Sequence, residues 1–286
     1  MTQLLRVGGV PEHFNYPWRL ALENGVFDGL DVEVDYREVP EGTGEMTRAL
    51  REGELDLALV LTEGAVADVL AHDRNRLVKV FVRSPLTWGL HVAAASPWES
   101  MAALENQRVA ISRYGSGSHL IAIVDAAARG WNTGDMRFVV VENLDGARRA
   151  LAAGEADLFL WEKHMTQPLV DAGEFRRLGV REVPWPAFVV SARRELLPGA
   201  DPLLRAVLER VAERGRRFKR QSDAADRIAE TYGLRVEQAR SWLGAVQWET
   251  DFEAPVEALH RAFDALRAQG VVDSAHFDLD RLWHGV

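Results

Sequence analysis

The sequence predicts an α/β protein with two similar lobes and a helical C-terminal segment. Three observations lead to this prediction. In the first half of the chain, strand-like and helix-like segments alternate, which is typical of parallel sheets with right-handed crossovers. The same order of segments then recurs about a hundred residues later. From about residue 195 onwards, the long segments all have the apolar spacing of amphipathic helices.

The first repeat contains four predicted strands and three predicted helices. Alternating or continuous apolar runs predict strands at 4–10, 30–39, 55–61 and 76–84. Amphipathic spacing predicts helices at 15–27, 42–54 and 64–72. Gly25 and Gly53 lie near two of the helix ends, where glycine commonly stops a helix. The strand LDLALVL (55–61) is almost continuously apolar, so we expect both of its faces to be buried.

The second repeat is visible in the letters themselves. RALREGELDLALVL (48–61) matches RALAAGEADLFLWE (149–162), with R-A-L-x-x-G-E-x-D-L in common at an offset of 101 positions. Upstream, LRVGGV (5–10) corresponds loosely to QRVAIS (107–112) at an offset of 102. Chance similarity of two helix–strand junctions is the alternative, but the shared order and near-constant offset favour a duplication. A period this long indicates two lobes and not a solenoid.

The rest of the chain joins and covers the two lobes. Extended segments at 83–95 and 181–194 would cross between the lobes and form a hinge. We expect lobe 1 to comprise residues 1–88 with 191–286, and lobe 2 to comprise residues 89–190. The tail should pack on one lobe, with helices at 201–221, 222–233, 235–247 and 254–270.

Composition narrows the classes of function. The net charge of −9 disfavours a nucleic-acid partner, and the basic run RGRRFKR (214–220) lies among acidic neighbours, as on a solvated helix face. The absence of cysteine excludes disulfides and thiolate metal sites, and no tight metal-ligand spacing occurs, so no cofactor and no metal are expected. No apolar run reaches the roughly 18–20 residues that membrane insertion needs. The opening MTQLLRVGGV does not resemble a signal peptide, so we expect a cytoplasmic protein, or a periplasmic one if an export signal has been removed.

Ligands of open parallel sheets bind beyond the carboxyl ends of the strands, and two facing lobes would bring those ends to one cleft. Seven aromatic residues fall in the corresponding loops and crossings of a chain that is 8% aromatic. Aromatic walls with a few polar groups hold small, flat or amphipathic molecules, although any one of these rings could belong to the core. The candidate ligand-binding residues from these segments are His13, Phe14, Trp18, Glu63, Ser84, Thr87, Trp88, Tyr114, Ser116, Gly117, Ser118, His119, Trp161, Glu162 and Lys163.

The stretch RYGSGSHL (113–120) lies between a predicted strand and a predicted helix. Its glycines would let the backbone approach a ligand, and Ser116 and Ser118 offer hydroxyls beside the free N–H groups of a helix start. Such a loop suits a phosphate, sulfonate, carboxylate or polar ring edge. It is neither a Walker A loop nor a G-x-G-x-x-G motif, and an ordinary helix cap is the alternative.

Four ionisable residues stand at equivalent points of the two repeats. Glu63 lies in TEGA (62–65), and Glu162, Lys163 and His164 lie in WEKH (161–164). A carboxylate close to a lysine or histidine can do acid–base chemistry. A role in orienting a ligand or bridging the lobes is the favoured interpretation.

Three segments resemble known binding proteins. GGVPEHFNYPWRLALENGVFDGLDVEV (8–34) resembles the opening of the thiamine-precursor and aliphatic-sulfonate binding proteins. ALREGELDLALVLTEG (49–64) and SRYGSGSH (112–119) resemble a later element and the Gly/Ser loop of the same proteins. Nearly the whole chain is thus similar to the type 2 periplasmic-binding-protein fold. The GVPEHFN form also resembles cytosolic relatives that lack an export signal.

The resemblance implies a two-lobed solute-binding protein that captures a small aromatic or anionic metabolite by closing a hinge. Its partners would be the small-molecule ligand and a membrane permease or another protein, as in ABC transport. By position, it adds Asn15 and Thr62 to the ligand loops that hold Phe14, Trp18 and Glu63, and it places Ser116–His119 and Trp161–Lys163 in two further loops. The alternative is a cytosolic enzyme of the vitamin-pathway or lyase type, in which a cleft Glu, His or Lys acts as the acid–base group. A ligand sensor that acts through a protein partner is a third interpretation.

Overall fold

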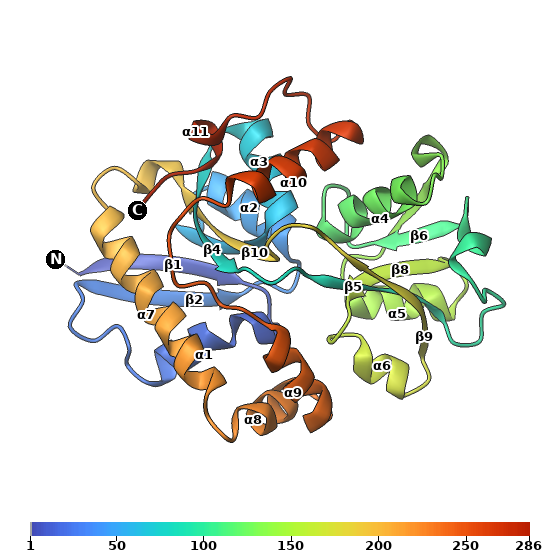
Figure 1. The fold of residues 1–286 in the computed structure, drawn as a ribbon, viewed down its shortest axis with the longest axis horizontal. Coiled ribbons are helices and arrows are strands. Elements are labelled where there is room, and N and C mark those ends of the chain that lie inside the picture. Colours follow the sequence, from blue (N-terminus) through green and yellow to red (C-terminus); the bar gives the residue numbers. More distant parts are fainter. Residues whose placement is uncertain (1) are drawn as a thin grey trace.

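The computed structural model describes residues 2–286, which form two five-stranded sheets covered by helices (Figure 1). The sheet of lobe 1 has the order β2-β1-β3-β10-β4, and the sheet of lobe 2 has the order β7-β6-β8-β5-β9. The strands of lobe 1 are β1 (Gln3–Gly9), β2 (Val32–Glu38), β3 (Leu57–Leu61), β4 (Asn75–Val82) and β10 (Phe188–Arg193). Those of lobe 2 are β5 (Thr87–Ala93), β6 (Arg108–Ile111), β7 (Arg137–Val140), β8 (Leu158–Glu162) and β9 (Phe175–Glu182).

Helices flank both sheets and form the C-terminal segment. Lobe 1 contains α1 (Tyr16–Glu23), α2 (Thr43–Arg51) and α3 (Thr62–His72), and lobe 2 contains α4 (Gly117–Ala128), α5 (Leu144–Ala152) and α6 (Gln167–Asp171). The C-terminal segment contains α7 (Asp201–Lys219), α8 (Ala224–Tyr232), α9 (Val236–Ala245), α10 (Val256–Ala268) and α11 (Leu279–Leu282). None of the described helices is both long and apolar enough to cross a membrane. The predicted α/β fold with a helical C-terminal region is confirmed.

Each sheet combines the parallel strands that the sequence predicts with one strand that runs in the opposite direction. Strand β10 runs antiparallel to β3 and β4, and β5 runs antiparallel to β8 and β9. Both strands are the ones by which the chain arrives from the other lobe. They therefore start at the edge that faces the gap between the sheets, whereas the βαβ strands end there. The topology makes these two strands antiparallel in otherwise parallel sheets.

The duplication is visible in matching structural details. Strands β1 and β3 pair in parallel as β6 and β8 do, with Val7 opposite Leu57 and Val109 opposite Leu158. Arg6 binds Asp56 through Nε and Oδ2 at 2.9 Å, and Arg108 binds Asp157 through the same atoms at 2.8 Å. Each aspartate also accepts the backbone N–H of its arginine, at 3.0 and 3.1 Å. The same Arg–Asp clamp thus joins the same two strands in both lobes.

The C-terminal segment packs mainly on lobe 1 and also reaches lobe 2. Helix α7 lies along α1 and α10 lies against α3 (Figure 1). Helix α9 contacts α6 of lobe 2, because Asp171 accepts a hydrogen bond from Gln238 Nε2 at 2.8 Å and pairs with Arg235 at 3.2 Å. The expectation that the tail packs on one lobe is therefore incomplete.

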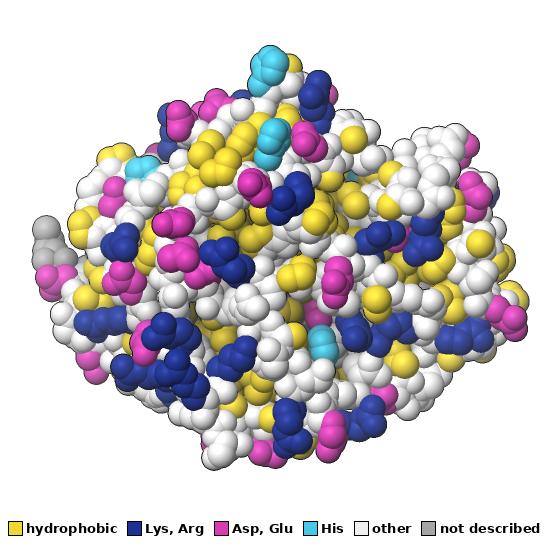
Figure 2. All heavy atoms as spheres, viewed as in Figure 1, with side chains coloured by type: hydrophobic (Ala, Val, Ile, Leu, Met, Phe, Trp, Pro, Cys, Tyr) yellow, Lys and Arg dark blue, Asp and Glu magenta, His cyan; other side chains and the backbone are white. Residues whose placement is uncertain are grey.

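The basic run 214–220 lies on α7 as part of a mixed surface. Arg216 and Arg217 both pair with Glu213, at 2.7 and 2.8 Å, and Phe218 is fully buried. In Figure 2, arginine, lysine and acidic side chains are interspersed over the visible face. Local ion pairs on a solvated helix face account for this run.

Two segments cross between the lobes, one from β4 to β5 and one from β9 to β10, and the second is tied to the start of α3. Ala187 N–H donates to Ser84 O at 3.1 Å, which joins the two crossings to each other. Thr62 Oγ1 donates to Pro186 O at 2.5 Å, and Trp185 Nε1 donates to Glu63 Oε2 at 2.9 Å. Glu63 is only 2% exposed, and burial raises its pKa to about 7.

Replacing the aspartate with alanine should destabilise the protein by different amounts in the two Arg–Asp clamps. Asp56→Ala should lower the free energy of unfolding by about 3 kcal/mol, because it leaves Arg6 and also Arg193, at 2.9 Å, without their buried acceptor. Asp157→Ala should cost about 1–2 kcal/mol, since Arg108 is more exposed. Asp35→Ala, which breaks an exposed pair, is the control and should cost roughly 0.5 kcal/mol or less. Urea unfolding measures all three values, and equal losses at Asp35 and Asp56 would contradict this assignment.

The buried carboxyl group of Glu63 predicts a pH dependence of stability. Because its pKa is raised from about 4.5 to about 7, the folded protein holds this proton more tightly than the unfolded chain does. The stabilisation that this bound proton gives to the folded protein is complete below pH 4.5 and declines as the pH rises to about 7. It amounts to about 3 kcal/mol in the free energy of unfolding. Glu63→Gln carries no such proton, so its unfolding free energy should fall less over this range. Identical pH profiles for the variant and the parent protein would refute the prediction, and the exposed Glu237→Gln serves as the control.

Candidate ligand-binding cavity

A cavity of about 310 Å³ lies between the two lobes. Its wall is built from the loops that follow strands β1 and β2 in lobe 1 and strands β6, β7 and β8 in lobe 2, together with the two crossings. From lobe 1 and the second crossing come Val10, Pro11, Glu12, Pro40, Glu41, Gly42, Thr43, Leu61 and Phe188. From the first crossing and lobe 2 come Leu86, Trp88, Ser112, Ser116, Gly117, Ser118, Asn143, Leu144, Asp145, Trp161, Glu162 and Met165. The carboxyl ends of the parallel strands thus meet at this cavity, as such sheets require.

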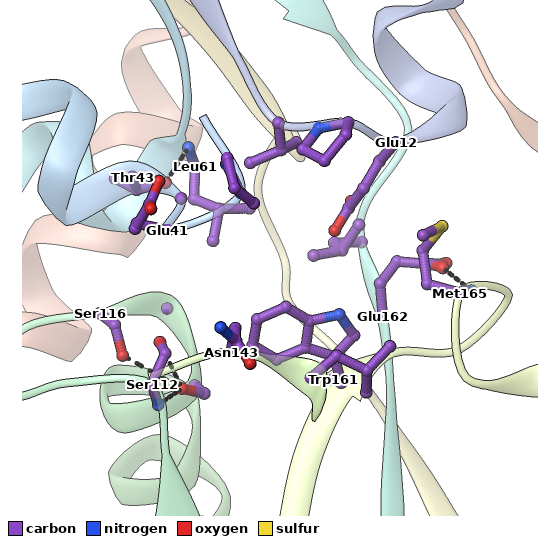
Figure 3. Close-up of a pocket in the computed structure, with 18 of the residues that line it drawn as sticks. Glu12, Glu41, Thr43, Leu61, Ser112, Ser116, Asn143, Trp161, Glu162 and Met165 are labelled. Atoms are coloured by element: carbon purple, nitrogen blue, oxygen red, sulfur yellow. Dashed lines mark hydrogen bonds between the residues drawn. The ribbon is translucent and has the colours of Figure 1, made fainter. Parts of the chain in front are cut away.

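The Gly/Ser loop forms one side of the cavity, and its Ser116 caps the N-terminus of helix α4. Ser116 Oγ accepts the His119 N–H at 3.4 Å, which satisfies one of the free donors of the helix start. Ser118 Oγ accepts the Ser112 N–H at 2.9 Å and lies 3.1 Å from Ser116 Oγ. These hydroxyls therefore bond to one another and hold the loop in shape beside the cavity (Figure 3).

Gly117 is the point at which this loop touches lobe 1. A Cβ atom at this position would lie 2.3 Å from Leu61 Cδ1 and 3.0 Å from Trp88 Cη2. Both distances are shorter than van der Waals contact, so a larger residue at position 117 requires Leu61 of lobe 1 and Trp88 of lobe 2 to shift. Nearby, Arg113 Nη2 donates to the carbonyl oxygen of Glu41 across the gap. Together with the Asp171 contacts to α9, these interactions join the lobes on two sides of the cavity.

Two carboxyl groups from opposite lobes point into the other side of the cavity. Glu12 follows β1 and Glu162 ends β8, and their side chains lie on the same side of the pocket (Figure 3). Glu162 is 3% exposed, and its Oε2 accepts the Met165 N–H at 2.7 Å. Burial, with a further contribution from the charge of Glu12, raises the pKa of Glu162 to about 8. Burial also raises the pKa of Glu12 to about 7.

The residues behind this acidic side do not neutralise it. His13 is fully buried, with its ring 4.2 Å from that of Trp242 and its Nε2 3.8 Å from Glu162 Oε2. Burial, and then the neighbouring His164, lowers the pKa of His13 far below its ordinary value. Burial also lowers the pKa of His164 to about 4, so both imidazoles are neutral at pH 7. The 3.8 Å contact is therefore not an ion pair.

Six of the candidate residues chosen from the sequence line the cavity: Trp88, Ser116, Gly117, Ser118, Trp161 and Glu162. The others lie outside its wall. Trp18 is fully buried in lobe 1 and stacks on Tyr36 at 5.9 Å. Phe14 packs on Phe188 at 5.1 Å, and Asn15 Nδ2 donates to Val10 O at 2.8 Å. These three residues support the loop that carries Glu12.

The remaining candidates hold the crossings or lie on the outer surface. Thr62, Glu63 and Ser84 tie the crossings together as described above, and Thr87 Oγ1 donates to Glu182 at 3.2 Å. Tyr114 is 65% exposed and packs against the ring of His119 at 5.2 Å, away from the cavity wall. Lys163 also lies outside the wall, although it follows Glu162 directly.

Sequence reasoning missed the loops after the second strand of each repeat. Thr43 follows β2 and accepts the Leu61 N–H at 3.0 Å, and Asn143 and Asp145 follow β7 at the equivalent place. The rule that ligands bind at the carboxyl ends of strands covers these loops too, and applying it to PEGTG (40–44) and NLDG (143–146) would have found them. Glu12 lies in a loop that was considered, but nothing in its neighbours distinguishes it.

Residues 2–286 contain no cluster of three or more His, Asp or Glu side chains placed to hold a metal ion. The chemistry available at the cavity is therefore that of aromatic faces, hydroxyl groups and two carboxyl groups with raised pKa values. Such a set can bind an organic molecule and can exchange a proton with it.

Comparison with solved structures identifies this architecture. The CA3427 gene product of Candida albicans, described as defining a family with the generic periplasmic-binding-protein fold, superposes with a TM-score of 0.88 at 24% identity, covering 98% of this chain and 94% of that one. The alkanesulfonate-binding protein SsuA of Xanthomonas axonopodis pv. citri, bound to MOPS, superposes with a TM-score of 0.82 at 20% identity over 98% of each chain. The periplasmic aliphatic sulphonate binding protein SsuA of Escherichia coli gives 0.72 at 19% identity, covering 100% and 94%.

Sequence comparison adds one further match. No curated protein matches the chain. The family model described as Ca3427-like PBP matches residues 88–181, which span the sheet of lobe 2 from Trp88 onwards. The resemblance inferred from the sequence is confirmed, and the chain has the periplasmic-binding-protein fold, with a lobe 2 that matches the Ca3427-like members of that fold.

Proposed function

We propose that this protein binds a small, partly apolar organic molecule in the cavity and closes its lobes around that molecule. The observation that carries the proposal is that both lobes contribute to the wall of one cavity and also touch beside it, at Gly117 and Arg113. A ligand in this position contacts both lobes only when they are closed. Its binding free energy therefore favours the closed arrangement over an open one.

The wall supports a ligand with a flat or apolar part. Trp88 and Trp161 from lobe 2 and Phe188 from the second crossing supply aromatic surface, and Leu61 and Leu86 supply aliphatic surface. A volume of about 310 Å³ is at the lower end of the range for small-molecule pockets, so the ligand is compact. The superposed SsuA proteins bind sulfonates, which are also compact molecules.

The two crossings would act as the hinge in such a closure. Each is a single extended segment, and Ala187 N–H to Ser84 O joins them, so the lobes can rotate about this pair. A membrane permease or another protein that recognises the closed form would be the partner of such a binding protein.

An acid–base enzyme is the second candidate, and one observation favours it. Glu12 and Glu162 have pKa values of about 7 and 8 and line the same cavity, as the acid–base groups of an enzyme often do. A molecule that stays chemically unchanged on the protein supports binding alone, and one that is converted supports the enzyme.

Native mass spectrometry of the purified protein, followed by small-angle scattering, tests the proposal. We expect a co-purified small molecule, whose removal expands the protein and whose return compacts it without change in its mass. A protein that carries no such molecule and keeps the same radius of gyration with and without extracts of small metabolites would contradict ligand-driven closure.

Gly117→Ala should oppose closure. The added methyl group overlaps with Leu61 of lobe 1 only when the lobes meet, so it destabilises the closed form by about 1–3 kcal/mol, whereas its approach to Trp88 lies within lobe 2. We expect a larger radius of gyration and an affinity for the co-purified molecule that is reduced roughly 5- to 100-fold. Gly179→Ala is the control, because a Cβ there meets nothing within 4 Å. Unchanged compaction and affinity in Gly117→Ala would show that the lobes need not meet at this point.

A further inference from the structure

We propose that the molecule held between the lobes is a small organic cation, an amine or amidine, whose protonated nitrogen lies between Glu12 and Glu162. This inference rests on the function proposed above and names the class of its ligand. It differs from the anionic ligand that the resemblance to sulfonate-binding proteins suggests. Four features of the cavity and of the residues around it support the inference.

The first feature is the placement of the two carboxyl groups. Glu12 is carried by lobe 1 and Glu162 by lobe 2, so they approach from opposite sides only when the lobes are closed (Figure 3). Met165 N–H donates to Glu162 Oε2 at 2.7 Å, and the backbone of His164 also donates to this carboxyl group. These donors are uncharged, so they do not balance the charge of the ionised carboxyl group.

The second feature is the charge of the wall. Four of its residues are acidic, namely Glu12, Glu41, Asp145 and Glu162, whereas its described residues include no lysine, arginine or histidine. An anion in this cavity would find no basic side chain in the wall, and it would be repelled wherever the carboxyl groups are ionised. A cation would supply the missing opposite charge.

The third feature is the set of basic residues that surround the acidic side. Arg177 donates to the carbonyl oxygen of Lys163 at 2.8 Å and to Gln167 at 2.7 Å, so its guanidinium is already occupied. His13 and His164 are neutral, as shown above. Lys163 lies outside the wall. The charges of Arg177 and Lys163 therefore act on Glu162 from behind and do not fill the space in front of it.

The fourth feature is the aromatic surface of the wall. The faces of Trp88 and Trp161 are favourable surfaces for a cation. The inferred ligand is a compact cation that can lie against an aromatic ring.

The pH dependence of binding distinguishes a cation from an anion. A cation binds the ionised carboxyl groups, so its affinity should rise as the pH rises through about 7 and 8, the pKa values of Glu12 and Glu162, with release of protons. An anion would require the protonated groups and show the opposite trend. The groups that face this pair are His13, His164, Lys163 and Arg177, and the two imidazoles stay neutral between pH 6 and 8.5 because burial lowers their pKa values.

Calorimetric titration with three probes of similar shape tests the inference. Benzamidine is the cation, benzyl alcohol the neutral molecule and benzenesulfonate the anion, and the first and last keep their charges from pH 6 to 8.5. We expect benzamidine to bind more tightly than the other two and to gain at least about tenfold in affinity over this range. The titration is repeated in two buffers of different ionisation enthalpy to count the protons released.

Two variants assign the effect to the carboxyl groups. Glu162→Gln and Glu12→Gln should each weaken benzamidine binding at least about tenfold and flatten its pH dependence, and the second variant keeps the test valid if the first does not fold. Glu237→Gln, on the exposed face of α9, should leave both unchanged.

Preferential binding of benzenesulfonate, falling affinity for benzamidine with rising pH, or no binding of benzamidine would overturn the inference. Compaction of the protein by its co-purified molecule would still support the binding function in each of those cases. Absence of any co-purified molecule and of any compaction would instead count against the binding function itself.

Discussion

The direction of strands β5 and β10 determines how the rest of the molecule is arranged. Each enters its sheet from the gap and runs away from it, so the other four strands, which run in the opposite direction, have their carboxyl ends at the gap. The loops that follow the inner parallel strands of one lobe then face the corresponding loops of the other lobe across the gap. The cavity is therefore a product of topology, and the side chains of these loops decide only what it can hold.

The side chains in that position are not those that would stabilise the fold most. The buried carboxyl group of Glu162, the partly buried one of Glu12 and the indole N–H of Trp88, which has no partner among residues 2–286, all raise the free energy of the protein. Apolar residues of similar size would remove this cost. Local conflict of this kind is expected at functional sites, whereas the Arg6–Asp56 and Arg108–Asp157 clamps at the far ends of the strands are fully satisfied.

The sequence was sufficient to predict the helices and strands, the duplication and part of the cavity wall. The repeat letters place Glu162 and the loop at Ser116 at the ends of strands, and physical rules then bring them to one cleft. The roles of Phe14 and Trp18 could not be predicted in this way, because the sequence around an aromatic residue is the same whether the ring lies in a core or in the wall of a binding site. Their burial depends on which neighbours the folded chain provides, here Phe188 and Tyr36. The reversed direction of β10 likewise follows from three-dimensional connectivity and leaves no local signal.

The place of β10 between β3 and β4 has a consequence for the growing polypeptide on the ribosome. Lobe 1 begins at the N-terminus, but one of its inner strands is supplied by Phe188–Arg193, after all of lobe 2 has been made. The sheet of lobe 2 is complete once Glu182 has emerged, since its five strands are continuous in the chain. The later half of the duplication can thus mature first, while β3 and β4 wait with unpaired edges that another chain could occupy. During synthesis, the strands that are made first therefore stay exposed for the longest time.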